Sequence, residues 1–187
     1  MSVERALGLP PKNYREFCTE YIYGMRNGVM TQHATLPFID NFLAEDQRNY
    51  FKFTIVRNSW DRMISAFYYL LPHNLENFGS FQGFLEHKYE LLGKAKNKEG
   101  SHYRPQIDYT HQDGKQVVDQ VIRFENLEKE FLGMCKSQGI QVKELPRVNI
   151  SKLREKKKLE DYTPSTRALV AEMYKDEIEE FGFKFGE

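Results

Sequence analysis

The sequence has little of several features that would mark particular classes of protein. It has no excess of charge, because 27 basic residues balance 27 acidic ones, which argues against a general polyanion or nucleic-acid binder. It has only two cysteines, Cys18 and Cys135, and no CxxC pair, so buried thiols are favoured over a disulfide or a metal centre. No apolar run approaches the roughly 20 residues of a membrane span.

The first residues also lack the apolar core of a signal peptide, since Glu4 and Arg5 interrupt them. As given, the chain is therefore expected to be soluble and cytoplasmic. A membrane or Golgi location stays open for a chain whose true N-terminus lies further upstream.

What is present is an ordinary globular composition. Hydrophobic residues make up 40% of the chain and charged residues 29%, and 14 Phe with 11 Tyr can bury large areas. The length of 187 residues fits one domain. No repeat or linker divides it, so residues 1–187 are expected to form a single domain.

The periodicity of apolar residues predicts an alternation of helices and strands. Strands are expected at 51–56 and 117–124, and the near-continuous apolar character of the first suits a parallel sheet covered on both faces. Helices are expected over these ranges: 14–25, 36–44, 60–71, 81–92, a segment from 125, and a last helix capped by Thr163. Such an order is typical of a layered α/β fold. Two strands make a poor sheet, so a further strand is expected to be missing.

The segment Thr54-Ile-Val-Arg57-Asn-Ser-Trp-Asp-Arg62-Met-Ile-Ser65-Ala-Phe-Tyr carries the strongest functional signal. A strand ends on Arg57, turns at once and opens a helix, whose first amides and positive dipole attract anions. The Arg57 guanidinium can grip a phosphate bidentately, and Ser65 can add a hydroxyl from the second turn. The alternative is an arginine at a strand end that pairs with a carboxylate.

The whole segment resembles the 3′-phosphate-binding motif of sulfotransferases that use 3′-phosphoadenosine 5′-phosphosulfate (PAPS). It departs from that motif at Ser59, where proline is usual, and at Phe67, where tyrosine is usual. His102-Tyr103-Arg104-Pro105-Gln106, Val121 to Leu127, and Phe181 to Phe185 resemble further family segments in the same order. The chain thus resembles the carbohydrate or heparan-type sulfotransferases, and it is similar to sulfotransferase family 2.

This resemblance implies a three-layer α/β fold related to P-loop kinases, with a small parallel sheet. It also implies transfer of a sulfuryl group from PAPS to a hydroxyl-bearing small molecule or carbohydrate, leaving adenosine 3′,5′-bisphosphate. It requires no metal, and it implies no nucleic-acid partner. The oligomeric state is open. The implied site residues are His33 as general base, Ser2, Arg57, Ser65 and Arg154 for the nucleotide, and His102 and Arg104 for the acceptor.

For two of these residues, a role without any ligand is an alternative. His33 suits proton abstraction near neutral pH, but a capping or surface histidine fits equally well. Arg154 lies in a basic stretch with Lys156, Lys157 and Lys158, and such stretches are usually solvated.

The other family signature, a Pro-Lys-Thr loop that cradles the 5′-phosphosulfate, has no counterpart in the sequence. Met1-Ser2-Val3 resembles the residues that end this loop, so the first strand and the loop lysine are expected upstream of residue 1. This leaves a second hypothesis, a catalytically impaired remnant that binds only adenosine 3′,5′-bisphosphate or the acceptor. A nucleotide kinase is disfavoured, because no GxxxxGK[ST] string is present.

Overall fold

The structure is a computed structural model that describes residues 25–26, 29–30, 34–40, 43, 45–69, 71–94, 103–146 and 159–187. The chain divides into two compact units. The first comprises residues 1–56 and 99–149, and the second comprises residues 57–98 and 150–187.

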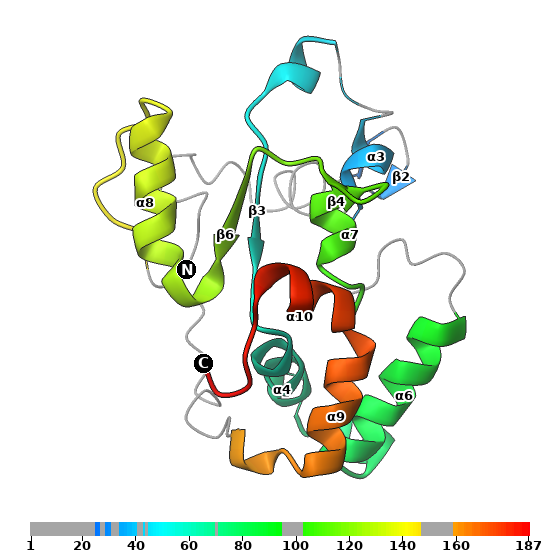
Figure 1. Ribbon diagram of the computed structural model, residues 1–187. Coiled ribbons are helices and arrows are strands. Elements are labelled where there is room, and N and C mark those ends of the chain that lie inside the picture. The colour runs from blue at the N-terminus through cyan, green and yellow to red at the C-terminus, as the bar shows by residue number, and fades with distance from the viewer. Residues whose placement is uncertain are drawn as a thin grey trace. The chain divides into compact units, whose positions relative to one another are not determined.

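A parallel pair of strands forms the centre of the first unit (Figure 1). Strand β3 (Phe53–Val56) pairs with β6 (Gln120–Arg123) in a register that joins Phe53 to Gln120 and Val56 to Arg123. Just before β3, the amide of Lys52 donates to Asp119 Oδ2 at 2.7 Å. Both strands and their parallel pairing were predicted from the sequence, and the mixed α/β character of the chain is confirmed.

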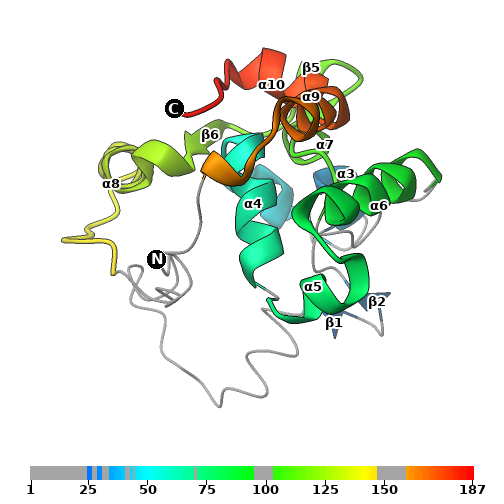
Figure 2. The same ribbon diagram turned by 90° about the horizontal axis from the view of Figure 1, so that it is seen from below.

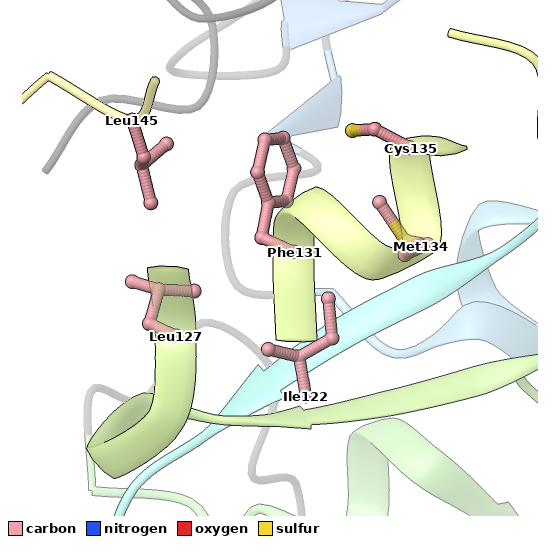
Figure 3. Packing of buried hydrophobic residues seen from close by; sticks show 6 residues of the cluster. All are labelled: Ile122, Leu127, Phe131, Met134, Cys135 and Leu145. Carbon is pink, nitrogen blue, oxygen red and sulfur yellow. The ribbon is translucent and has the colours of Figure 1, made fainter. Parts of the chain in front are cut away.

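Helix α8 (Leu127–Ser137) supplies most of the core of this unit. Figure 3 shows its apolar side chains gathered with Ile122 of β6 and with Leu145 from the segment after the helix. Phe131 and Ile122 are fully buried, and Cys135 is a buried free thiol. The four residues that the sequence placed on the inner face of this helix are buried as expected: Leu127, Phe131, Met134 and Cys135.

The other elements that the structure describes in the first unit are short. They are β1 (Met25–Arg26), β2 (Val29–Met30), α3 (Leu36–Ile39), η2 (Asp46–Asn49), α7 (Ile107–Thr110), β4 (His111–Gln112), β5 (Lys115–Gln116) and η3 (Phe124–Asn126). The helix predicted for 36–44 is therefore shorter than expected, and Thr35 at its start makes no side-chain cap. Met25, predicted to end a helix, pairs with Met30 in an antiparallel ladder.

The second unit is helical in the part that the structure describes. Its elements are α4 (Ser59–Tyr69), α5 (His73–Phe78), α6 (Phe81–Lys94), η5 (Leu159–Asp161), α9 (Pro164–Met173) and α10 (Lys175–Phe181). Helices α4 and α6 both pack against α9, as Figure 2 shows. An aromatic cluster lies between them, in which the ring of Phe67 is 5.3 Å from that of Phe81 and 5.5 Å from that of Phe84.

The end of the chain is shaped by local signals. Thr163 caps α9 through a reciprocal pair with Thr166, with Pro164 at the first helical position, as the sequence predicted. The single last helix expected from the sequence is instead two, because the chain leaves helical geometry at Tyr174. Gly182 then ends α10 with a φ of 64°, which suits glycine. Within the described ranges, no helix is long and apolar enough to cross a membrane.

Candidate functional site

Two residues of the predicted phosphate site lie within the described ranges: Arg57, two residues before helix α4, and Ser65, in the second turn of that helix. Arg57 Nη1 donates to Ser65 Oγ at 3.2 Å. The guanidinium also binds Asp61 through its Nε. From its place before the helix, the long side chain of Arg57 reaches both Asp61 and Ser65. The Arg57 and Asp61 side chains are 24% and 32% exposed, which leaves this face partly open to solvent.

The carboxylate pairing that the sequence left open for Arg57 is present, and its role as a phosphate ligand stays a prediction. The arginine pairs with a carboxylate, and it also meets the serine expected to share its phosphate. The Asp61 charge offsets part of the positive potential, so an incoming anion competes with Asp61 for the guanidinium. The hydroxyl of Ser65 accepts from Arg57, and within the described residues no acceptor takes its hydrogen, which can be donated to an anion.

The start of α4 differs from the sequence-based expectation of unoccupied amides. Asn58 precedes the helix, and its Oδ1 accepts from the amide of Trp60 at 3.1 Å and, at a longer 3.5 Å, from the amide of Asp61. The helix thus carries its own cap. The expectation that these first amides await an anion is wrong for Trp60, so an anion depends mainly on side chains here.

Ser59 has a role that the sequence did not reveal. The hydroxyl donates to Glu177 Oε1 at 2.6 Å, and both residues are fully buried. Arg62 Nη2 donates to the same oxygen at 3.0 Å and supplies the countercharge that a buried carboxylate needs. Glu177 lies 118 positions after Ser59, and no local signal in the sequence could have linked them.

Tyr162 borders the same turn. Its hydroxyl donates to the main-chain oxygen of Trp60 at 2.8 Å. Burial, followed by the nearby Asp61 carboxylate, raises the pKa of Tyr162 well above its ordinary value. The phenol therefore stays neutral and keeps donating across the physiological pH range.

The other predicted site residues are placed as follows. Ser2, His33, His102 and Arg154 lie outside the described residues. Arg104 belongs to the first unit, is 5% exposed, and has its Nε 4.0 Å from Asp108 Oδ2. Its Cζ lies 5.9 Å from the centre of the Tyr109 ring. Of the predicted set, the structure thus brings together Arg57 and Ser65.

A search of the described residues for groups of three or more His, Cys, Asp or Glu side chains able to hold a metal ion finds none. The site that the structure does show consists of the Arg57 guanidinium, from the turn before α4, with the Ser65 hydroxyl and the competing Asp61 carboxylate on that helix. Those groups can bind and orient an anion.

Comparison with known protein families matches the chain to a family model. The description of that family is "Sulfotransferase family", and it matches residues 15–184. No curated protein and no solved structure matches the chain. The family match spans the strand, the turn and helix α4 with Arg57 and Ser65, and it extends through the C-terminal helices. The chain belongs to the sulfotransferase family.

Proposed function

We propose that this protein transfers a sulfuryl group from PAPS to a hydroxyl of an acceptor, with a carbohydrate as the first candidate. The observation that carries the proposal is the pairing of Arg57 with Ser65 at 3.2 Å on a partly exposed helix face. Family membership supports the reaction class, and sulfotransferases of this family generally use PAPS.

The described residues fit the 3′-phosphate of such a nucleotide. The planar guanidinium of Arg57 offers donors in a fork that matches phosphate oxygens, and the Ser65 hydroxyl can add a further donor beside it. Hydrogen bonds to a charged group are the stronger class, so two such donors make a specific contact. PAPS, when bound, would supply the sulfuryl group.

Other parts of the proposal rest on the sequence. His33 is proposed to take the proton of the acceptor hydroxyl, while Ser2 and Arg154 are proposed to contact the nucleotide. His102 and Arg104 are proposed to shape the acceptor side. The two units are proposed to be parts of one three-layer domain related to P-loop kinases, in which a further strand and a 5′-phosphosulfate loop complete the sheet.

A second candidate is a protein that binds adenosine 3′,5′-bisphosphate, or the acceptor, without turnover. One observation favours it: the 187 residues contain no Pro-Lys-Thr string for the 5′-phosphosulfate. Losing preorganised donors at a developing negative charge typically costs several kcal/mol of transition-state stabilisation.

Calorimetry with two nucleotides tests the 3′ site. Adenosine 3′,5′-bisphosphate should bind more tightly than adenosine 5′-monophosphate, which lacks the 3′-phosphate. Ser65→Ala should weaken the bisphosphate about fivefold to tenfold, as for one lost hydrogen bond, and leave the monophosphate unchanged. Ser137→Ala, an exposed serine that bonds the main chain of α8, is the matched control.

Transfer of labelled sulfate from PAPS to a panel of saccharides separates the two candidates. Turnover supports the enzyme, and tight bisphosphate binding without turnover supports the binding protein. If the bisphosphate binds no better than the monophosphate, the 3′-phosphate assignment is wrong.

A further inference from the structure

The first turn of α4 is held by residues from the end of the chain. Three bonds reach it from that segment. Asn58 Nδ2 donates to the main-chain oxygen of Lys184 at 2.7 Å, Ser59 Oγ donates to Glu177 at 2.6 Å, and Trp60 Nε1 donates to the main-chain oxygen of Arg167 at 3.0 Å. Consecutive residues of the turn thus each have a partner more than a hundred positions away in the sequence. Figure 1 shows α10 and the segment after it beside the start of α4.

The three donor residues are buried, and the Ser59–Glu177 bond is buried at both ends, whereas the bonds to Lys184 and Arg167 are part-buried. Asn58 is 2% exposed, Ser59 and Glu177 are 0% exposed, and Trp60 is 6% exposed. Water cannot replace a partner lost between Ser59 and Glu177, so breaking that bond leaves a buried polar group without this partner. The turn therefore has one well-defined position as long as the C-terminal segment is in place.

Packing supports the same contact. The ring of Phe185 meets that of Trp60 edge-to-face at 5.8 Å between centroids. Arg62, which shares Glu177 with Ser59, places its Cζ 4.4 Å from the centre of the Tyr174 ring. Glu177 of α10 thus accepts hydrogen bonds from two side chains near the start of α4, Ser59 and Arg62.

The held residues lie directly beside the proposed phosphate ligands. Arg57 precedes Asn58 in the chain, and Ser65 lies in the second turn of α4, where its hydroxyl accepts from Arg57 Nη1. A small change in the direction of the first turn moves the Arg57 backbone relative to Ser65. Since bidentate contacts depend on donor geometry, such a change affects phosphate binding more than contacts elsewhere on the nucleotide.

We propose that Glu177 is a positioning residue for the phosphate site, which it sets through Ser59 and Arg62 at the start of α4. This inference rests on the proposed function, because it takes the 3′-phosphate to bind at Arg57 and Ser65. Coupling between the two places is reciprocal. A bound 3′-phosphate therefore stabilises α10 and the segment after it.

The test compares Glu177→Gln with Glu179→Gln, a matched change on the same helix. Glu179 is 67% exposed and forms a long, 3.9 Å ion pair with the exposed Lys175. Such a surface pair contributes little to stability. Glu177→Gln should weaken adenosine 3′,5′-bisphosphate about tenfold, towards the low end of usual coupling between sites, and leave adenosine 5′-monophosphate unchanged. In the parent, the bisphosphate should slow hydrogen exchange at residues 175–185, and in Glu177→Gln it should do so less.

Ser59→Ala carries the test if Glu177→Gln does not fold, because it removes one hydroxyl and keeps the Arg62–Glu177 pair. It should weaken the bisphosphate about threefold to fivefold, again without an effect on the monophosphate. If Glu177→Gln and Ser59→Ala bind the bisphosphate as tightly as the parent does, the positioning role is overturned and the proposed function is left intact. Equal weakening of both nucleotides overturns it too, since a merely structural residue has that effect. A parent that shows no preference for the bisphosphate refutes the proposed function itself.

Discussion

Replacing Arg57 with alanine should weaken binding of adenosine 3′,5′-bisphosphate by about thirtyfold. A positive charge about 4 Å from a phosphate contributes roughly 1 kcal/mol in water and about 4 kcal/mol at the lower effective dielectric of a protein surface. The side chain is 24% exposed and already shares its charge with Asp61, so a value between these limits applies. A loss of about 2 kcal/mol in binding free energy corresponds to about thirtyfold weaker binding.

The ion pair between Arg57 and Asp61 leads to a second, more specific prediction. In Arg57→Ala the Asp61 carboxylate stays behind without its guanidinium and repels the phosphate. Adding Asp61→Asn should then recover about 1 kcal/mol, so that the double variant binds about fivefold more tightly than Arg57→Ala. In the parent, Asp61→Asn should change affinity less, because the lost repulsion is offset by a less well oriented guanidinium.

Calorimetry on the four proteins of this double-mutant cycle measures the coupling. Arg48→Ala is the control for net charge, since Arg48 is exposed and donates to the main-chain oxygen of Asp40 at 3.2 Å. If Arg57→Ala binds as tightly as the parent, Arg57 is not a phosphate ligand. If Asp61→Asn has the same effect with and without Arg57, the two do not act as a unit.

Two further predictions concern the hydrophobic core at Phe131 and the pKa of Tyr68. Phe131→Ala should lower the free energy of unfolding by about 3–5 kcal/mol in urea denaturation, because a fully buried ring is lost, whereas Leu91→Ala at a 46% exposed position should change it by less than about 0.5 kcal/mol. Equal losses would show that Phe131 is not a core residue. Tyr68 donates to Asp161 at 2.5 Å, a hydrogen bond that raises the pKa of Tyr68 to about 12. The difference in phenolate absorbance between the parent and Tyr68→Phe should therefore have its midpoint near that value, and a midpoint at the ordinary value near 10 would contradict the contact. Since the folded pKa is raised, the stability from this bond is present below pH 10 and is lost as pH rises towards 12.

The sequence alone determined the local elements of this protein. The apolar run at 53–56, the helical spacing of Met63, Ile64 and Phe67, and the cap at Thr163 act over a few residues. The formation of these elements depends on backbone propensity and on which face is apolar, so β3, β6, α4, α6, α8 and the start of α9 lie near where they were predicted. The errors fall on marginal segments such as α3, where a short apolar run supports only one turn.

The sequence also determined half of the candidate site. Arg57 and Ser65 are eight residues apart in one strand–turn–helix segment, so their contact depends on the local path of the chain and on the length of the arginine side chain. The competing carboxylate at Asp61 was equally local, and the alternative of an arginine–carboxylate pair already allowed for it.

Only the tertiary structure decided what holds that site in place. The bond from Ser59 to Glu177 closes a separation of 118 residues, and that from Asn58 to Lys184 closes 126. Such contacts depend on how whole helices pack, and many buried acceptors would satisfy a serine equally well. Propensity and periodicity carry no information about which acceptor it meets, so the bonds from Asn58, Ser59 and Trp60 to the C-terminal segment could be learned only from the packing.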